Sequence, residues 1–103
     1  MKTISSQRYI NDDIVAEKIS AVDFEVMVSP SFEIDGEIYR VVLDGHHSLF
    51  AAKSAGADPV FFEADSTDHD AVSLITNGDV EGFLSAVHMG DDYYDTDNGQ
   101  DIW

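Results

Sequence analysis

Residues 32–43, FEIDGEIYRVVL, place an Asp-Gly pair between two runs that are rich in β-branched and aromatic residues. A two-residue hairpin turn needs positive φ, which Asp and Gly adopt more readily than most residues. The sequence therefore predicts a β-hairpin over residues 31–43 that turns at Asp35 and Gly36. Its second arm becomes apolar throughout at residues 41–43, which is typical of a strand buried on both faces.

The hairpin leads directly into a segment that predicts a helix and then another strand. Residues 46–55, HHSLFAAKSA, consist largely of good helix formers, and Gly56 is a typical C-terminal cap. The apolar run PVFFEA follows at residues 59–64. We therefore predict a strand-helix-strand unit over residues 38–64, and the expected connection is a right-handed parallel crossover.

The flanking segments predict one more strand and three more helices. Alternation over residues 24–28 indicates a strand. Residues 11–19 predict a short helix that is capped by Asn11 or Asp12, with three apolar side chains facing inward. These three residues are Ile14, Val15 and Ile19.

Two further helices are expected after the strand at residues 59–64. Thr67 and Asp70 have the spacing of a capping box for a helix over residues 67–76. Asp79 is positioned to cap the next helix, whose apolar residues follow the spacing of one buried face. These residues are Val80, Phe83, Leu84 and Val87.

These elements predict a single small domain of the α/β (α+β) class, with a mixed β-sheet. We assign residues 1–90 to the domain. Residues 91–103, DDYYDTDNGQDIW, form an acidic aromatic tail that we expect to fold back or to make a small hairpin.

Charge limits the classes of partner. The chain carries 21 Asp and Glu against five Lys and Arg, a formal net charge of −16. Such a chain repels phosphate backbones and anionic membranes, so direct binding to DNA or RNA is not expected. It attracts basic proteins. The absence of cysteine, of a long apolar run and of an apolar N-terminal core fits a cytoplasmic protein.

The segment VVLDGHHSLFAAKSAGADPVFFEA, residues 41–64, resembles the superfamily of ParB N-terminal domains and sulfiredoxins. The shared pattern is an apolar strand, Asp-Gly-His-Arg or a close variant, an alanine-rich helix, Gly and a strand. The resemblance covers these residues closely and residues 20–88 more loosely. It implies the ParB/sulfiredoxin-like fold and a phosphate site at the loop and helix start, which in some members holds CTP or ATP. It also suggests a phage or plasmid setting.

Two departures from that pattern matter for function. The arginine of the superfamily falls on Ser48, which cannot bind a phosphate in a bidentate way. The catalytic cysteine of sulfiredoxin would fall on His46, which excludes that activity. There is also no room for a helix-turn-helix DNA-binding domain.

The loop DGHHS carries the candidate site for a physical reason that is independent of family. A glycine turn lets the backbone approach a ligand, and a helix start offers unpaired N–H groups and partial positive charge. Asp44, His46 and His47 are the candidate catalytic residues. The remaining candidates are ligand-binding residues, namely Gly45, Ser48, Arg40 and Lys53.

The three candidate catalytic residues also have a purely structural interpretation. Asp44 can serve the turn by accepting backbone N–H bonds. His47 can pack under the helix while His46 remains a solvated polar side chain. No spacing of histidines and carboxylates is typical of a metal site, although Mg²⁺ can accompany a bound ATP, ADP or CTP.

Two functions of different classes follow. The first is a domain that binds a nucleotide or another small phosphate ligand at DGHHS, with phosphotransfer or nucleotide hydrolysis as its boldest form. The second is an acidic interaction module, such as an antitoxin, an immunity protein or an inhibitor that mimics nucleic acid. That module would bind a basic protein through Tyr93, Tyr94 and Trp103 in the tail. The same aromatics can instead cover a sheet edge. A nuclease ranks lowest because no dense metal site is present.

Overall fold

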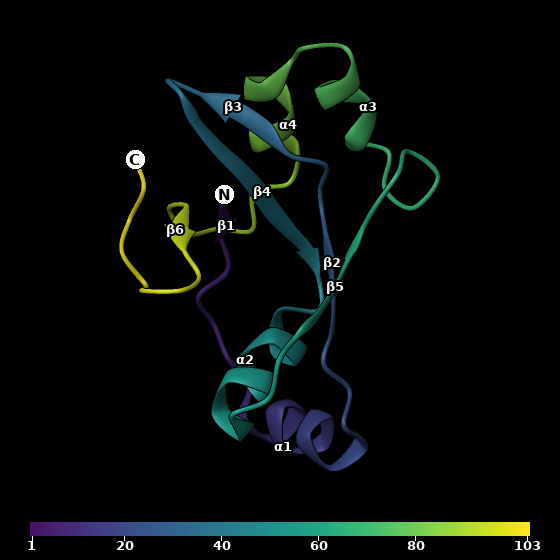
Figure 1. The fold of residues 1–103 in the computed structure, drawn as a ribbon, viewed down its shortest axis with the longest axis vertical. Helices are drawn as coiled ribbons and strands as arrows, with labels where there is room; N and C mark the ends of the chain where they lie inside the picture. Colours follow the sequence, from purple (N-terminus) through teal and green to yellow (C-terminus); the bar gives the residue numbers. More distant parts are fainter.

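The longest strand, β4 (Glu37–Asp44), organises the sheet (Figure 1). The computed structural model describes residues 1–103. On one edge, β4 pairs in an antiparallel sense with β3 (Phe32–Ile34) and with β2 (Glu25–Val28). On its other edge, β4 pairs in parallel with β1 (Lys2–Ser5). The result is a mixed sheet, as the sequence predicts.

Two short strands extend this sheet outward. β5 (Val60–Glu63) pairs in parallel with β2, and β6 (Tyr94–Asp95) pairs with β1 in an antiparallel sense. The order is β5-β2-β4-β1-β6, with β3 beside β4. Six strands and four helices form one domain of the α+β class.

The predicted parallel crossover between β4 and β5 is wrong, although its strand, helix and strand are all present. β5 is parallel to β2, which is antiparallel to β4, so β5 runs opposite to β4 and is separated from it by β2. The intervening helix, α2 (His46–Ala55), lies beyond the end of β4 rather than across a face of the sheet (Figure 1). The chain therefore turns back from α2 toward the sheet.

The hairpin turn and two helix caps that the sequence predicts are confirmed. Asp35 and Gly36 have φ values of 50° and 84°, so both turn residues of the hairpin are left-handed. Gly56 is the left-handed C-cap of α2. Asn11 caps α1 (Asp12–Ala21) by accepting hydrogen bonds from the amides of Asp13 and Ile14. These features depend on neighbouring residues only.

The prediction that three apolar residues of α1 face inward is wrong for two of them. Val15 is buried, but Ile14 and Ile19 are 37% and 38% exposed. α1 packs mainly against α2 at the end of the molecule away from α4, so only a narrow stripe of the helix is covered (Figure 1).

The predicted capping box at Thr67 and Asp70 is also wrong. α3 (Val72–Thr76) begins five residues later than expected. The carboxylate of Asp65 accepts hydrogen bonds from the amides of Thr67 and Asp68, at 2.8 and 3.2 Å. These local bonds hold the chain in turns instead of a helix. The following helix, α4 (Val80–Ala86), is capped by Asp79 as expected, and the Asp79 side chain accepts a hydrogen bond from the Gly82 amide.

Apolar residues fill both faces of the sheet. The larger cluster includes Val41, Leu43, Phe83 and Val87, and α3 and α4 cover this side. The smaller cluster consists of Val26, Val28, Val42 and Leu49. Since residues 41 and 42 of β4 point to opposite faces and both are buried, the prediction of a strand buried on both sides is confirmed.

Residues 91–103 lie along the free edge of β1. β6 pairs with β1, and Tyr94 also forms a bridge with Asp101. Trp103 contacts Tyr39 and Tyr93, with ring centroids 5.4 and 5.8 Å away. No helix has the length and the continuous apolar character that a bilayer crossing needs.

Candidate functional site

The Asp44–Gly45 turn joins the end of β4 to the first residue of α2. Gly45 has φ of 86°, and a Cβ atom there would lie 2.5 Å from the carbonyl oxygen of Glu25. It would also lie 3.0 Å from the Cα of Val26. Gly45 is therefore required both for its left-handed conformation and for the close approach of β2. This contact fixes where α2 begins.

The first amides of α2 have no partner within the protein. No side chain caps the helix, and the N–H groups of His46, His47 and Ser48 donate no hydrogen bond to another group. Only the Gly45 amide is satisfied nearby, by Asp44 Oδ1 at 2.7 Å. A helix start of this kind presents unpaired donors and partial positive charge to whatever lies in front of it.

Three hollows adjoin this helix start, and the two larger ones are lined by His46. The first, which we call the turn cavity, has a volume of about 230 Å³ and is lined by all five residues of the DGHHS loop, together with Gln7 and Lys18. The second, the flank cavity, measures about 250 Å³ and lies along the side of α2. Its lining is Arg8, Ile10, His46, Leu49, Phe50, Lys53, Tyr94 and Thr96. His46 lines both cavities.

His46 is the least satisfied polar side chain of the site. Both ring nitrogens are shielded from solvent, and neither has a hydrogen-bond partner. Burial, with a smaller contribution from the charge of His47, lowers the pKa of His46 to about 4. The imidazole is therefore neutral at pH 7. An unpaired buried polar group costs about 1–3 kcal/mol, so this arrangement is costly for the protein alone.

His47 and Asp44 have structural roles in the geometry observed. His47 Nε2 accepts a hydrogen bond from the backbone N–H of Asn11 at 3.1 Å. This bond connects the N-terminal cap of α1 to the start of α2. Asp44 is exposed and accepts the Gly45 amide, as a turn residue does. Both residues nevertheless line the turn cavity.

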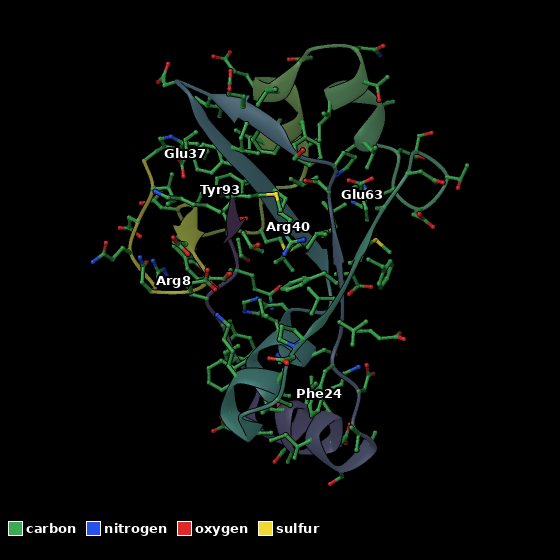
Figure 2. All side chains as sticks on the ribbon, in the orientation of Figure 1. Arg8, Phe24, Glu37, Arg40, Glu63 and Tyr93 are labelled. Carbon is green, nitrogen blue, oxygen red and sulfur yellow. The ribbon has the colours of Figure 1, made fainter.

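The structure separates the two predicted cationic residues. Arg40 lies over the ring of Phe61 at 4.1 Å, and its Nε donates to Thr3 Oγ1 at 2.8 Å. Figure 2 shows Arg40 on the sheet, above the two helices at the narrow end. Arg40 lines neither cavity, whereas Lys53 lines the flank cavity together with His46.

Two cations at the site were missed by the sequence analysis. Lys18 of α1 lines the turn cavity, and Arg8 lines the flank cavity. Lys18 pairs with Asp23 at 2.9 Å, and this hydrogen bond raises the pKa of Lys18. Arg8 pairs with Asp101 at 2.6 Å. No local motif marks either residue, because both reach the site only through the packing of the fold.

The three predicted partner-binding aromatics do not form one exposed surface. Tyr93 is buried and donates its hydroxyl to the Leu84 carbonyl at 2.6 Å. Tyr94 donates to the Gln7 carbonyl at 2.6 Å and lines the flank cavity. Trp103 is 52% exposed. Two of the three residues therefore serve the fold.

Comparison of the chain with family models, with curated proteins and with solved structures finds no match. The likeness of residues 41–64 to ParB N-terminal domains and sulfiredoxins thus remains a prediction from sequence. The site also contains no cluster of three His, Asp or Glu side chains positioned to hold a metal ion.

We expect His46 to make the free energy of unfolding rise with pH between about 4 and 6.5. In this window the unfolded histidine, with a normal pKa of 6.5, binds a proton that the folded one, with a pKa of about 4, does not. The stabilisation is complete above pH 6.5 and is lost as the pH falls toward 4. Because the side chain is only partly buried, solvent screening reduces the effect to about 1–2 kcal/mol.

Urea unfolding of the wild type and of His46→Leu at several pH values measures this contribution. The carboxylates titrate in both proteins and cancel in the difference. We expect the wild type to lose stability relative to the variant as the pH is lowered. A difference that stays constant from pH 4 to pH 7 would contradict the neutral state of His46.

Proposed function

We propose that the protein binds a small phosphorylated ligand of the nucleotide class in the turn and flank cavities. The observation that carries this proposal is His46, which lines both cavities and has both ring nitrogens buried and unpaired. A ligand in these cavities would supply the missing hydrogen bonds once the ring rotates to expose its nitrogens. It would thereby remove a cost that the free protein bears.

The turn cavity suits the phosphate end of such a ligand. The free amides of residues 46–48 face an anion with donors and with the positive end of the helix dipole. Gly45 supplies the left-handed turn that sets the start of this helix, with φ of 86°. Lys18 lines the same cavity and adds a full positive charge.

The distribution of cations supports the same assignment. The chain has five Lys and Arg, and three of them, Arg8, Lys18 and Lys53, line the two cavities. Each pairs with a carboxylate that is more than one-third exposed. Exposed ion pairs of this kind contribute only about 0–1 kcal/mol. A bound phosphate can therefore take over these cations at little cost.

The flank cavity suits a flat apolar group. Ile10, Leu49 and Phe50 give it an apolar lining, and Tyr94 adds an aromatic ring. Ligand cavities typically combine such a lining with a few directed polar groups. A nucleobase in the flank cavity and phosphates in the turn cavity would place His46 between them.

The proposal is limited to binding. Phosphoryl transfer depends on cations held against the transferred group, and Ser48 occupies the position of the arginine that the ParB/sulfiredoxin pattern places there. Neutral His46 cannot replace that charge. Mg²⁺ bound to the ligand would offset the repulsion between its phosphates and Asp44.

Isothermal titration calorimetry with ATP, ADP and CTP, each with and without Mg²⁺, tests the proposal. We expect saturable binding of at least one nucleotide, and at least a tenfold weaker affinity for His46→Leu, since the variant loses both hydrogen-bonding nitrogens. Lys53→Gln should weaken binding severalfold. Lys2→Gln is the matched control, because Lys2 pairs with Glu37 and lines neither cavity.

Two outcomes would contradict the proposal. One is the absence of binding by all three nucleotides at millimolar concentration. The other is equal affinity in the wild type and in His46→Leu, which would place the ligand elsewhere.

A further inference from the structure

β5 is an edge strand whose outer side carries free backbone groups. β2 is its only strand neighbour, and no other element packs extensively along it. The amides of Val60 and Ala64 donate toward the β2 side, to Phe24 and Val28, at 2.8 Å each. Successive residues of a strand alternate in direction, so the N–H and C=O groups of Phe61 and Glu63 point away from the sheet.

This edge is only partly protected, by its short length of four residues and by the charge of Glu63. It has no lysine, and no helix packs extensively along it. Pro59, which has no N–H to donate, lies just before the strand and hinders pairing only at its start. On one face, Val60 and Phe62 are 58% and 42% exposed. By contrast, β6 covers the opposite edge of the sheet, at β1.

The charge around this edge is negative. Exposed carboxylates lie along the strand and in the turns that flank it, and no lysine or arginine follows Lys53 in the chain. Of the nearby cations, Arg40 is stacked on Phe61, and Lys18, which pairs with Asp23, lines a hollow with Phe62. The carboxylates are Asp58, Glu63, Asp65 and Asp68. A second copy of this chain, also at −16, would be repelled.

We propose that the outer edge of β5 binds an extended, basic segment of a partner protein as an added strand. Main-chain hydrogen bonds to Phe61 and Glu63 would supply affinity without dependence on sequence. Alternate side chains of the segment would contact Val60 and Phe62, and lysines or arginines would face the carboxylates. Phe62 borders the DGHHS turn, since it lines a third hollow with Asp44, Gly45 and Ser48. The two proposals still rest on different groups, the outward backbone of β5 and the His46 ring, so either can fail without the other.

The test uses the full chain and a short acetylated peptide of alternating lysine and valine. Binding is measured by fluorescence anisotropy at low ionic strength, and amide hydrogen exchange locates the peptide on the protein. We expect saturable binding, added protection at Phe61 and Glu63, and loss of affinity as salt is raised.

Glu63→Pro removes one outward N–H without removing a bond to β2, and proline is tolerated at such edge positions. We expect it to weaken binding at least tenfold. Glu63→Gln is the matched control, because it removes the charge and keeps the N–H, and it should weaken binding by less than threefold. A peptide that is N-methylated at alternate residues should not bind the wild type, which tests the same hydrogen bonds without changing the protein.

Several results would overturn the proposal. These are equal binding of a glutamate-valine peptide, unchanged binding by Glu63→Pro or by the N-methylated peptide, and protection that appears away from β5. A dimer of the protein that Glu63→Pro abolishes would show that a second copy occupies the edge instead.

Discussion

Replacing Gly45 by alanine should lower the free energy of unfolding by about 3 kcal/mol, because two costs act at the same atom. The residue has a left-handed φ of 86°, which a Cβ atom strains. The added Cβ would also meet the Glu25 carbonyl oxygen at 2.5 Å, a contact with backbone that cannot rotate away. Either β2 or the start of α2 must therefore move.

Gly36→Ala is the matched control for this substitution. Gly36 has nearly the same φ, 84°, but no atom lies within 4 Å of the point that an alanine Cβ would occupy there. It should cost only about 1 kcal/mol, from strain alone. Urea unfolding of the two variants separates strain from collision. Equal losses of stability would show that β2 does not press on the turn.

Tyr93→Ala should lower the free energy of unfolding by about 3–4 kcal/mol, although the residue lies in the acidic tail. The side chain is only 8% exposed and belongs to the larger apolar cluster with Phe83 and Val87. Its hydroxyl also donates to the Leu84 carbonyl at the end of α4. Truncation would leave a cavity and an unpaired carbonyl.

Two comparisons refine the Tyr93 experiment. Tyr93→Phe should cost about 1 kcal/mol, because it removes only the hydroxyl. Trp103→Ala should cost less than Tyr93→Ala, since half of the Trp103 side chain is already in water. Thermal or urea unfolding measures all three. If Tyr93→Ala unfolds like the wild type, the tail is not part of the cooperative domain.

The parts of the fold that the sequence predicts correctly depend on neighbouring residues. The Asp35–Gly36 turn, the Gly56 cap and the Asn11 cap each follow from the conformational preferences of one or two side chains. The direction of β5 does not follow from local preferences. It depends on how α2 is placed relative to the sheet. β1 was not expected either, since KTIS at residues 2–5 becomes a strand only by pairing with β4.

In the candidate site, too, the sequence predicts what neighbouring residues determine and misses what long-range packing determines. Residues 44–48 are contiguous, so the sequence alone places them together at a turn and helix start. Arg8 and Lys18 join them through long-range packing, and no pattern in the sequence indicates this. Arg40 shows the reverse case, since it is near the loop in sequence but is held away from it by Phe61 and Thr3.

The pairing of β1 with β6 has a consequence for how the chain matures. Residues 2–5 are translated about 90 residues before their partner at residues 94–95. During translation one side of β1 therefore stays open to other nascent chains. The acidic tail must be synthesised before that side can close, so the sheet cannot be complete until residue 95 has been made.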